Sequence, residues 1–215
     1  MKELKNVGKN SMDTVYQLKA NTADDGSGVV FGGGTHIAFP WPVNPLGEEL
    51  ALVVTIDCSV LNHKIGEELF PAGKVLSVFS TYSSDRYFLD DITFHGDSEE
   101  LEHISKGYSR VLLSEKSDDF INENYFGPIS VEVTKREVNS EDFPAFSFVS
   151  KVIPRGLIGY GVLGDEYYFA AQIYSGDIPF DDGGILGLSD ATGYLFLRKR
   201  IDGFSNAGVF FIQVS

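Results

Sequence analysis

Residues 50–56 have the sequence LALVVTI, a nearly continuous apolar run that is rich in β-branched side chains. A run of this length and composition predicts a strand that other elements cover on both faces. Further apolar runs between turn-forming residues predict more strands, at residues 73–82, 86–94, 109–113, 129–134, 167–174, 193–197 and 208–214. The turn-like sequence of residues 83–85, SSD, predicts that the strands at 73–82 and 86–94 pair as a hairpin.

One short helix is predicted among these strands. Asp97 and Glu100 have the spacing of a capping box, and Leu101 and Ile104 follow at helical spacing. The helix is expected to end near Gly107. Because 17 Phe, 10 Tyr and 23 Gly are typical of strands joined by tight turns, and 215 residues can form one sizeable core, we expect a single β-rich domain over residues 1–215.

The chain is acidic, and the acidity is concentrated in its middle. Asp and Glu number 31 against 17 Lys and Arg, which gives a formal charge of −14. Between Asp85 and Asp142 there are fifteen acids and six bases, a local charge of −9. Such a field repels nucleic acid and anionic membranes and attracts basic surfaces, although solubility alone is an equally good explanation of the charge.

The sequence also favours a cytoplasmic location. The first twenty residues lack the continuous apolar segment of a secretory signal. Nowhere do about 18 consecutive apolar residues suggest a membrane span. A lone cysteine, Cys58, fits a reducing compartment and cannot form an internal disulfide.

Two glycine-rich sequences match nucleotide-binding motifs only as text. Gly159, Gly161 and Gly164 have dinucleotide-motif spacing, but two carboxylates and a predicted strand follow them. That motif needs a strand that turns into a helix, and carboxylates repel phosphates. Residues 66–74 resemble a phosphate loop, yet Val75 replaces the hydroxyl residue that binds magnesium. We therefore expect no nucleotide cofactor.

Catalytic and metal-binding patterns are missing as well. His36, His63, His95 and His103 include no pair at the close helical spacing of metal ligands. Cys58 follows an apolar strand, which favours a buried, inert thiol over a nucleophile paired with His63. No Gly-x-Ser-x-Gly sequence supports a serine hydrolase. We expect no catalytic residues, no metal and no cofactor.

Four sequence features together resemble the YwqG-like proteins of unknown function, the DUF1963 family. They are Phe31-Gly-Gly33, Phe39-Pro-Trp41-Pro42, the strand that ends Thr55-Ile56-Asp57, and Phe70-Pro71 with Gly73, Leu76 and Phe79. Residues 184–189, 193–197, 204 and 209–214 fit the carboxyl end of the family, whereas residues 80–165 match poorly, and Thr55 stands where the family has glutamine. The chain is identified as a divergent member. The resemblance implies an α+β fold dominated by bent, mostly antiparallel sheet, with one or two short helices.

The family resemblance implies no established activity, but the family occurs among genes of bacterial toxin systems. We hypothesise an immunity-type protein that binds a cognate bacterial toxin with a basic surface and masks its active site or substrate surface. Acidic side chains would steer association and buried aromatics would supply affinity. The candidate partner-binding residues are Tyr82, Asp85, Tyr87, Asp90, Asp91, Asp118, Asp119, Asp181 and Asp182.

An alternative hypothesis is a small-molecule-binding protein or an enzyme with a pocket near the loop at residues 32–41. Trp41 and His36 would line that pocket. Trp41 lies between Pro40 and Pro42, and an indole held in this way more often anchors a loop to the core.

Overall fold

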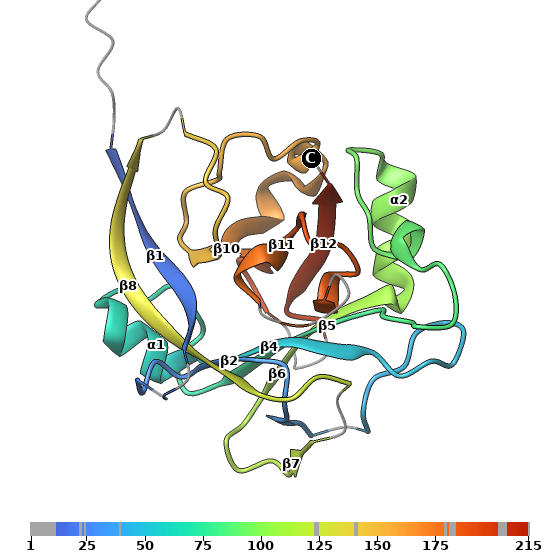
Figure 1. Cartoon of the computed structure of the whole chain (residues 1–215), viewed down its shortest axis with the longest axis horizontal. Helices are drawn as coiled ribbons and strands as arrows, with labels where there is room; N and C mark the ends of the chain where they lie inside the picture. Colours follow the sequence, from blue (N-terminus) through green and yellow to red (C-terminus); the bar gives the residue numbers. More distant parts are fainter. Residues whose placement is uncertain are drawn as a thin grey trace, which may run out of the picture.

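The computed structural model describes residues 12–21, 23, 25–38, 40–122, 125–139, 142–178, 180, 184–201 and 206–214. Strands dominate it (Figure 1). They are β1 (Met12–Asn21), β2 (Val29–Phe31), β3 (Thr35–His36), β4 (Ala51–Asp57), β5 (Val75–Ser80), β6 (Ser109–Ser114), β7 (Phe120–Ile121), β8 (Ile129–Asn139), β9 (Phe148–Val149), β10 (Tyr167–Tyr174), β11 (Ala191–Arg198) and β12 (Gly208–Val214).

The helical elements are short. Two are α-helices, α1 (Cys58–Ile65) and α2 (Ser98–His103), and a π-helical turn, η2 (Ile104–Tyr108), extends α2. Four are 3₁₀ segments, namely η1 (Leu89–Asp91), η3 (Tyr160–Glu166), η4 (Ser175–Asp177) and η5 (Gly184–Leu186). This composition confirms the predicted α+β, β-dominated class.

Ten strands form one antiparallel sheet in the order β12-β11-β10-β9-β1-β8-β2-β4-β5-β6, and β3 pairs with β7 in a separate two-stranded ribbon. The large sheet bends until its two ends meet, since Ala207 N donates to Val111 O over 2.9 Å and Ser109 Oγ to Phe210 O over 2.6 Å. The strands of Figure 1 therefore surround a shared interior. The predicted bent, mostly antiparallel sheet is confirmed.

The apolar run at residues 50–56 lies at the centre of the core, as predicted. Its strand β4 buries side chains on both faces, because Val54 and Ile56 join the largest apolar cluster while Leu50 and Leu52 pack with Trp41 and Phe79 on the other side. The predicted strands at 109–113, 129–134, 167–174, 193–197 and 208–214 are also confirmed, and β8 extends the second of them to Asn139.

The predicted strand at residues 86–94, and with it the predicted hairpin, is wrong. β5 pairs with β4 and β6 instead. Residues 89–91 form η1, in which Asp91 N bonds to Phe88 O and Ile92 N to Leu89 O. Asp90 and Asp91 interrupt the apolar run, and such residues favour turns over strands.

The predicted helix is present as α2. Asp97 caps it, with Glu100 completing a capping box, and Gly107 ends the following turn at a φ of 127°. Helix α1 was not predicted, although Asp57 caps it and Gly66 ends it in the left-handed conformation at a φ of 73°. No helix in the described part of the chain is long and apolar enough to cross a membrane.

Candidate partner-binding surface

Five of the predicted partner-binding residues lie on one loop, between β5 and α2. Tyr82 is half-buried and its ring contacts the rings of Phe88 and Phe126, with centroids 5.4 and 4.9 Å away. Asp85 and Asp90 are exposed, and Tyr87 is 69% exposed. The loop thus carries carboxylates and a solvent-facing aromatic ring on a base that is anchored in the core.

Arg86 fixes the shape of this loop. Its Nε and Nη2 donate to the two carboxylate oxygens of Glu48 over 2.8 and 2.6 Å, and its Nη1 lies 2.7 Å from Oδ2 of Asp91. Asn44 Nδ2 donates to the same Glu48 over 2.7 Å. A two-point contact of this kind sets orientation as well as distance. It joins the loop after β5 to the loop before β4, which meet at one side of the molecule (Figure 1).

Asp91 is less exposed, and so less able to contact a partner, than the sequence suggested. Its side chain is 14% exposed, and its second oxygen lies 3.2 Å from His103 Nε2 on α2. The sequence did not predict the contact with His103, because Asp91 lies in the predicted strand at 86–94 and His103 lies in the predicted helix. Asp91 therefore positions Arg86, whereas Asp85 and Asp90 face solvent.

Tyr125 completes the surface from a third segment. Its ring centroid is 5.7 Å from that of Tyr82, and the residue is 55% exposed. Partial burial raises the pKa of its hydroxyl, and the negative charges of Glu49, Glu48 and Asp85 raise it further. These three carboxylates therefore lie close enough to Tyr125 for their charges to act on its hydroxyl.

We call these residues the acidic aromatic surface. It contains five carboxylates and one guanidinium, a formal charge of −4, together with three tyrosine rings. Carboxylates pair with Lys and Arg side chains, and an exposed tyrosine face accepts a cation as well. Its members are Glu48, Glu49, Tyr82, Asp85, Arg86, Tyr87, Asp90, Asp91 and Tyr125.

Sequence reasoning missed Glu48, Glu49, Arg86 and Tyr125. Glu48-Glu49 is itself an acidic pair, and Tyr125 lies in the acidic middle segment, so composition offered a signal for each. Nothing in the sequence could pair Arg86 with Glu48, which is 38 residues away.

Asp118 and Asp119 do not join this surface. Asp118 O lies 2.9 Å from His36 Nδ1, and Asp119 O accepts a hydrogen bond from Ile37 N, so both residues contact the β3 segment. The Asp118 side chain accepts a bond from Glu115 N within its own turn. Asp181 and Asp182 lie outside the described residues.

Trp41, one of the two residues proposed to line a pocket at the loop of residues 32–41, lies in the core. Trp41 is 7% exposed, donates from Nε1 to Leu50 O over 2.8 Å, and packs edge-on against Phe79. Its side chain is part of the core, as the sequence favoured. The His36 ring contacts Phe120 on the neighbouring strand.

The glycine motif and Cys58 have the local structure that the sequence predicted. Gly159 precedes η3, Gly161 and Gly164 lie within it, and strand β10 follows, so the motif does not turn from a strand into an α-helix. Cys58 is fully buried, and burial raises the pKa of its thiol to about 12. Within the described residues, no three His, Cys, Asp or Glu side chains are grouped to hold a metal ion.

Comparisons with protein-family models, curated proteins and solved structures found no match to this chain.

Proposed function

We propose that the chain is a binding protein for a partner protein with a basic surface, and that the acidic aromatic surface is its docking site. The observation that carries the proposal is the convergence of three separate segments, at residues 44–49, 82–91 and 125, into one patch of carboxylates and exposed tyrosines. In protein interfaces, Tyr side chains are common at the hot spots, and charged side chains at the rim guide the approach of the partner. This patch contains both kinds of side chain.

The geometry favours rapid and specific association. Because Arg86 already holds Glu48 and Asp91, the loop needs little ordering when a partner arrives. Glu49, Asp85 and Asp90 remain exposed and can attract cationic side chains from a distance. Tyr87 and Tyr125 offer apolar area with few rotatable bonds, which supports a slow dissociation.

We further propose that the partner is a toxin of the nucleic-acid or nucleotide class. Proteins that bind polyanions present Lys and Arg in their clefts. An acidic, aromatic patch is complementary to such a cleft and can occlude it, which is the action of an immunity protein. The family resemblance and the overall charge of −14 motivate this finer assignment.

Affinity capture with matched variants tests the proposal. The wild-type chain, Tyr87→Ala, and Tyr160→Ala as the control would be immobilised and exposed to a lysate of the native host. Tyr160 is 40% exposed and lies on η3, outside the acidic aromatic surface. We expect quantitative mass spectrometry to find a basic protein retained by the wild type and by Tyr160→Ala but lost with Tyr87→Ala.

Two results would oppose the proposal. Retention of every captured protein by Tyr87→Ala would exclude this surface as the docking site. Capture of an acidic or neutral partner in a Tyr87-dependent way would exclude the basic toxin class. Inhibition of the captured protein's activity by stoichiometric wild-type chain is the additional result that immunity requires.

A further inference from the structure

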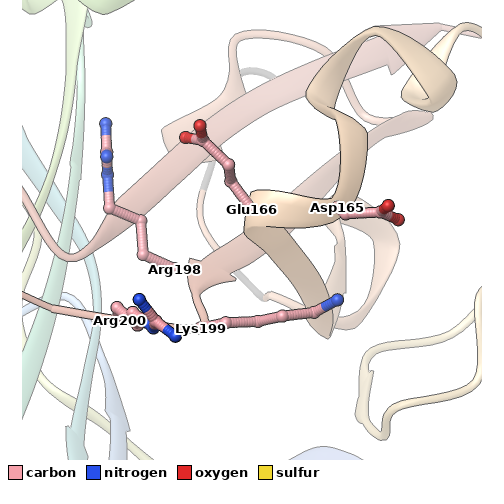
Figure 2. A pocket seen from close by; sticks show the side chains of 5 residues that line it. All are labelled: Asp165, Glu166, Arg198, Lys199 and Arg200. Atoms are coloured by element: carbon pink, nitrogen blue, oxygen red, sulfur yellow. The ribbon is translucent and has the colours of Figure 1, made fainter.

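A second charged site lies where strand β10 begins and β11 ends. There, a hollow of about 480 Å³ is lined by Asp165, Glu166, Arg198, Lys199 and Arg200 (Figure 2). Lys199 N donates to Glu166 O over 2.8 Å, so a backbone hydrogen bond joins the two segments that line the hollow. The volume is in the range of small-molecule sites, which run from about 300 to 1,000 Å³.

The three cations of this hollow belong to the Lys and Arg side chains of the described residues that form no ion pair. Six other Lys and Arg side chains of the described residues have a carboxylate oxygen within 4.0 Å, namely Lys64, Lys74, Arg86, Lys106, Lys116 and Lys135. No described carboxylate oxygen lies within that distance of Arg198, Lys199 or Arg200. Three consecutive cations therefore remain available to an anion in a chain of net charge −14.

Arg198 supplies the most specific observation. Its guanidinium carbon lies 5.2 Å from the centroid of the Tyr167 ring, which holds the side chain in place across the paired strands β10 and β11. Its Nε is buried and has no hydrogen-bond acceptor among the described residues. A buried donor normally finds a partner, and an anion that shifts the Arg198 side chain on binding is one way to provide it.

A smaller hollow shares Arg198 with the first. Arg110 lines it together with Ser105 and Ser109. Arg110 likewise has no carboxylate within 4.0 Å in the described part of the chain. This third arginine, on β6, adds positive charge on that side of the site.

The lining also restricts the ligand. In Figure 2 the Glu166 side chain extends to the same side as Arg198, whereas Asp165 extends away from both arginines. A carboxylate repels a phosphate but accepts hydrogen bonds from hydroxyl groups. Arg198 covers one face of the Tyr167 ring, so this face is closed to a stacking nucleobase.

We propose that this hollow binds a phosphorylated small molecule that also carries hydroxyl groups, such as a sugar phosphate. Its phosphate lies against Arg198 and Arg200, whose planar guanidinium groups match phosphate oxygens, and Lys199 adds charge. Its hydroxyl groups donate to Glu166. The site is separate from the acidic aromatic surface and needs no partner protein.

Isothermal titration with ribose 5-phosphate, inorganic phosphate and ribose tests the proposal. The wild type is expected to bind ribose 5-phosphate more tightly than phosphate, and ribose hardly at all. Arg200→Gln and Arg198→Lys should each weaken ribose 5-phosphate binding about tenfold. The first removes a charged contact with the phosphate, and the second removes a two-point contact. Glu166→Gln should weaken ribose 5-phosphate binding but strengthen phosphate binding, because it removes a repulsive charge.

The control is Lys19→Gln, which removes an exposed cation on β1 and should leave binding unchanged. Thermal melts would verify that each variant is folded. If Arg198→Lys does not fold, Arg200→Gln alone is enough to test the role of the arginines. Absence of binding by the wild type at about 10 mM ligand would overturn the proposal. An equal loss in Lys19→Gln would overturn it too, because binding would then follow net charge alone.

Discussion

Glu48→Gln tests how firmly Arg86 holds the acidic aromatic surface. The hydrogen bonds and charge of Arg86, together with the hydrogen bond from Asn44, lower the pKa of Glu48 from 4.5 to about 2. A difference of this size corresponds to at most about 3 kcal/mol of folding free energy. Because the Arg86 and Glu48 side chains are 28% and 30% exposed, solvent screens the pair, and we expect a loss of about 1 to 2 kcal/mol at neutral pH.

The pH dependence has a definite sign. A carboxyl group whose pKa is lower in the folded chain stabilises the fold above its unfolded-state pKa, and this contribution is lost as pH falls through the folded value. The difference in unfolding free energy between wild type and Glu48→Gln should therefore be full above about pH 5 and less than half as large at about pH 3.

Urea denaturation followed by Trp41 fluorescence at both pH values measures this difference. Glu49→Gln is the matched control, because Glu49 is exposed and adjacent, and its substitution should change stability by about 0.5 kcal/mol or less. Equal stability of Glu48→Gln and wild type at neutral pH would refute the idea that the Arg86–Glu48 contact holds the two loops together.

Two further predictions concern the core. Trp41→Ala should cost about 3 to 5 kcal/mol, because it removes a buried indole and its bond to Leu50 O, and an unchanged melting temperature would contradict this. Cys58 should resist a thiol reagent under native conditions and react fully in urea, since burial raises its pKa to about 12, and rapid native labelling would show that the thiol is accessible.

Local patterns predicted much of the sheet. The apolar run at residues 50–56 and the terminal strand at 208–214 are recognisable because both faces are largely buried and every side chain except those of Thr55 and Gln213 is apolar. Strand β1 was missed, since its sequence MDTVYQLKAN mixes polar and apolar residues, and its pairing with β8 and β9 comes from parts of the chain more than 100 residues away.

The candidate surface was predictable only in part. Four members were identified because they lie close together in the sequence, in or beside an acidic segment. They are Tyr82, Asp85, Tyr87 and Asp90. Glu48 and Tyr125 reach the surface through contacts with Arg86 and Tyr82 that depend on the tertiary fold. Asp118 was included on charge alone, although its contacts are with β3 and its own turn.

The association rate of the captured partner measures the central claim most directly. Stopped-flow mixing at low and high salt would compare the wild type with Asp85→Lys and with Asp119→Lys, a matched charge reversal on an exposed residue that contacts β3. We predict that the wild-type association rate falls as salt rises, and that Asp85→Lys slows association at low salt at least about threefold more than Asp119→Lys does. An association rate insensitive to salt and equal in all three proteins would contradict docking through the acidic aromatic surface.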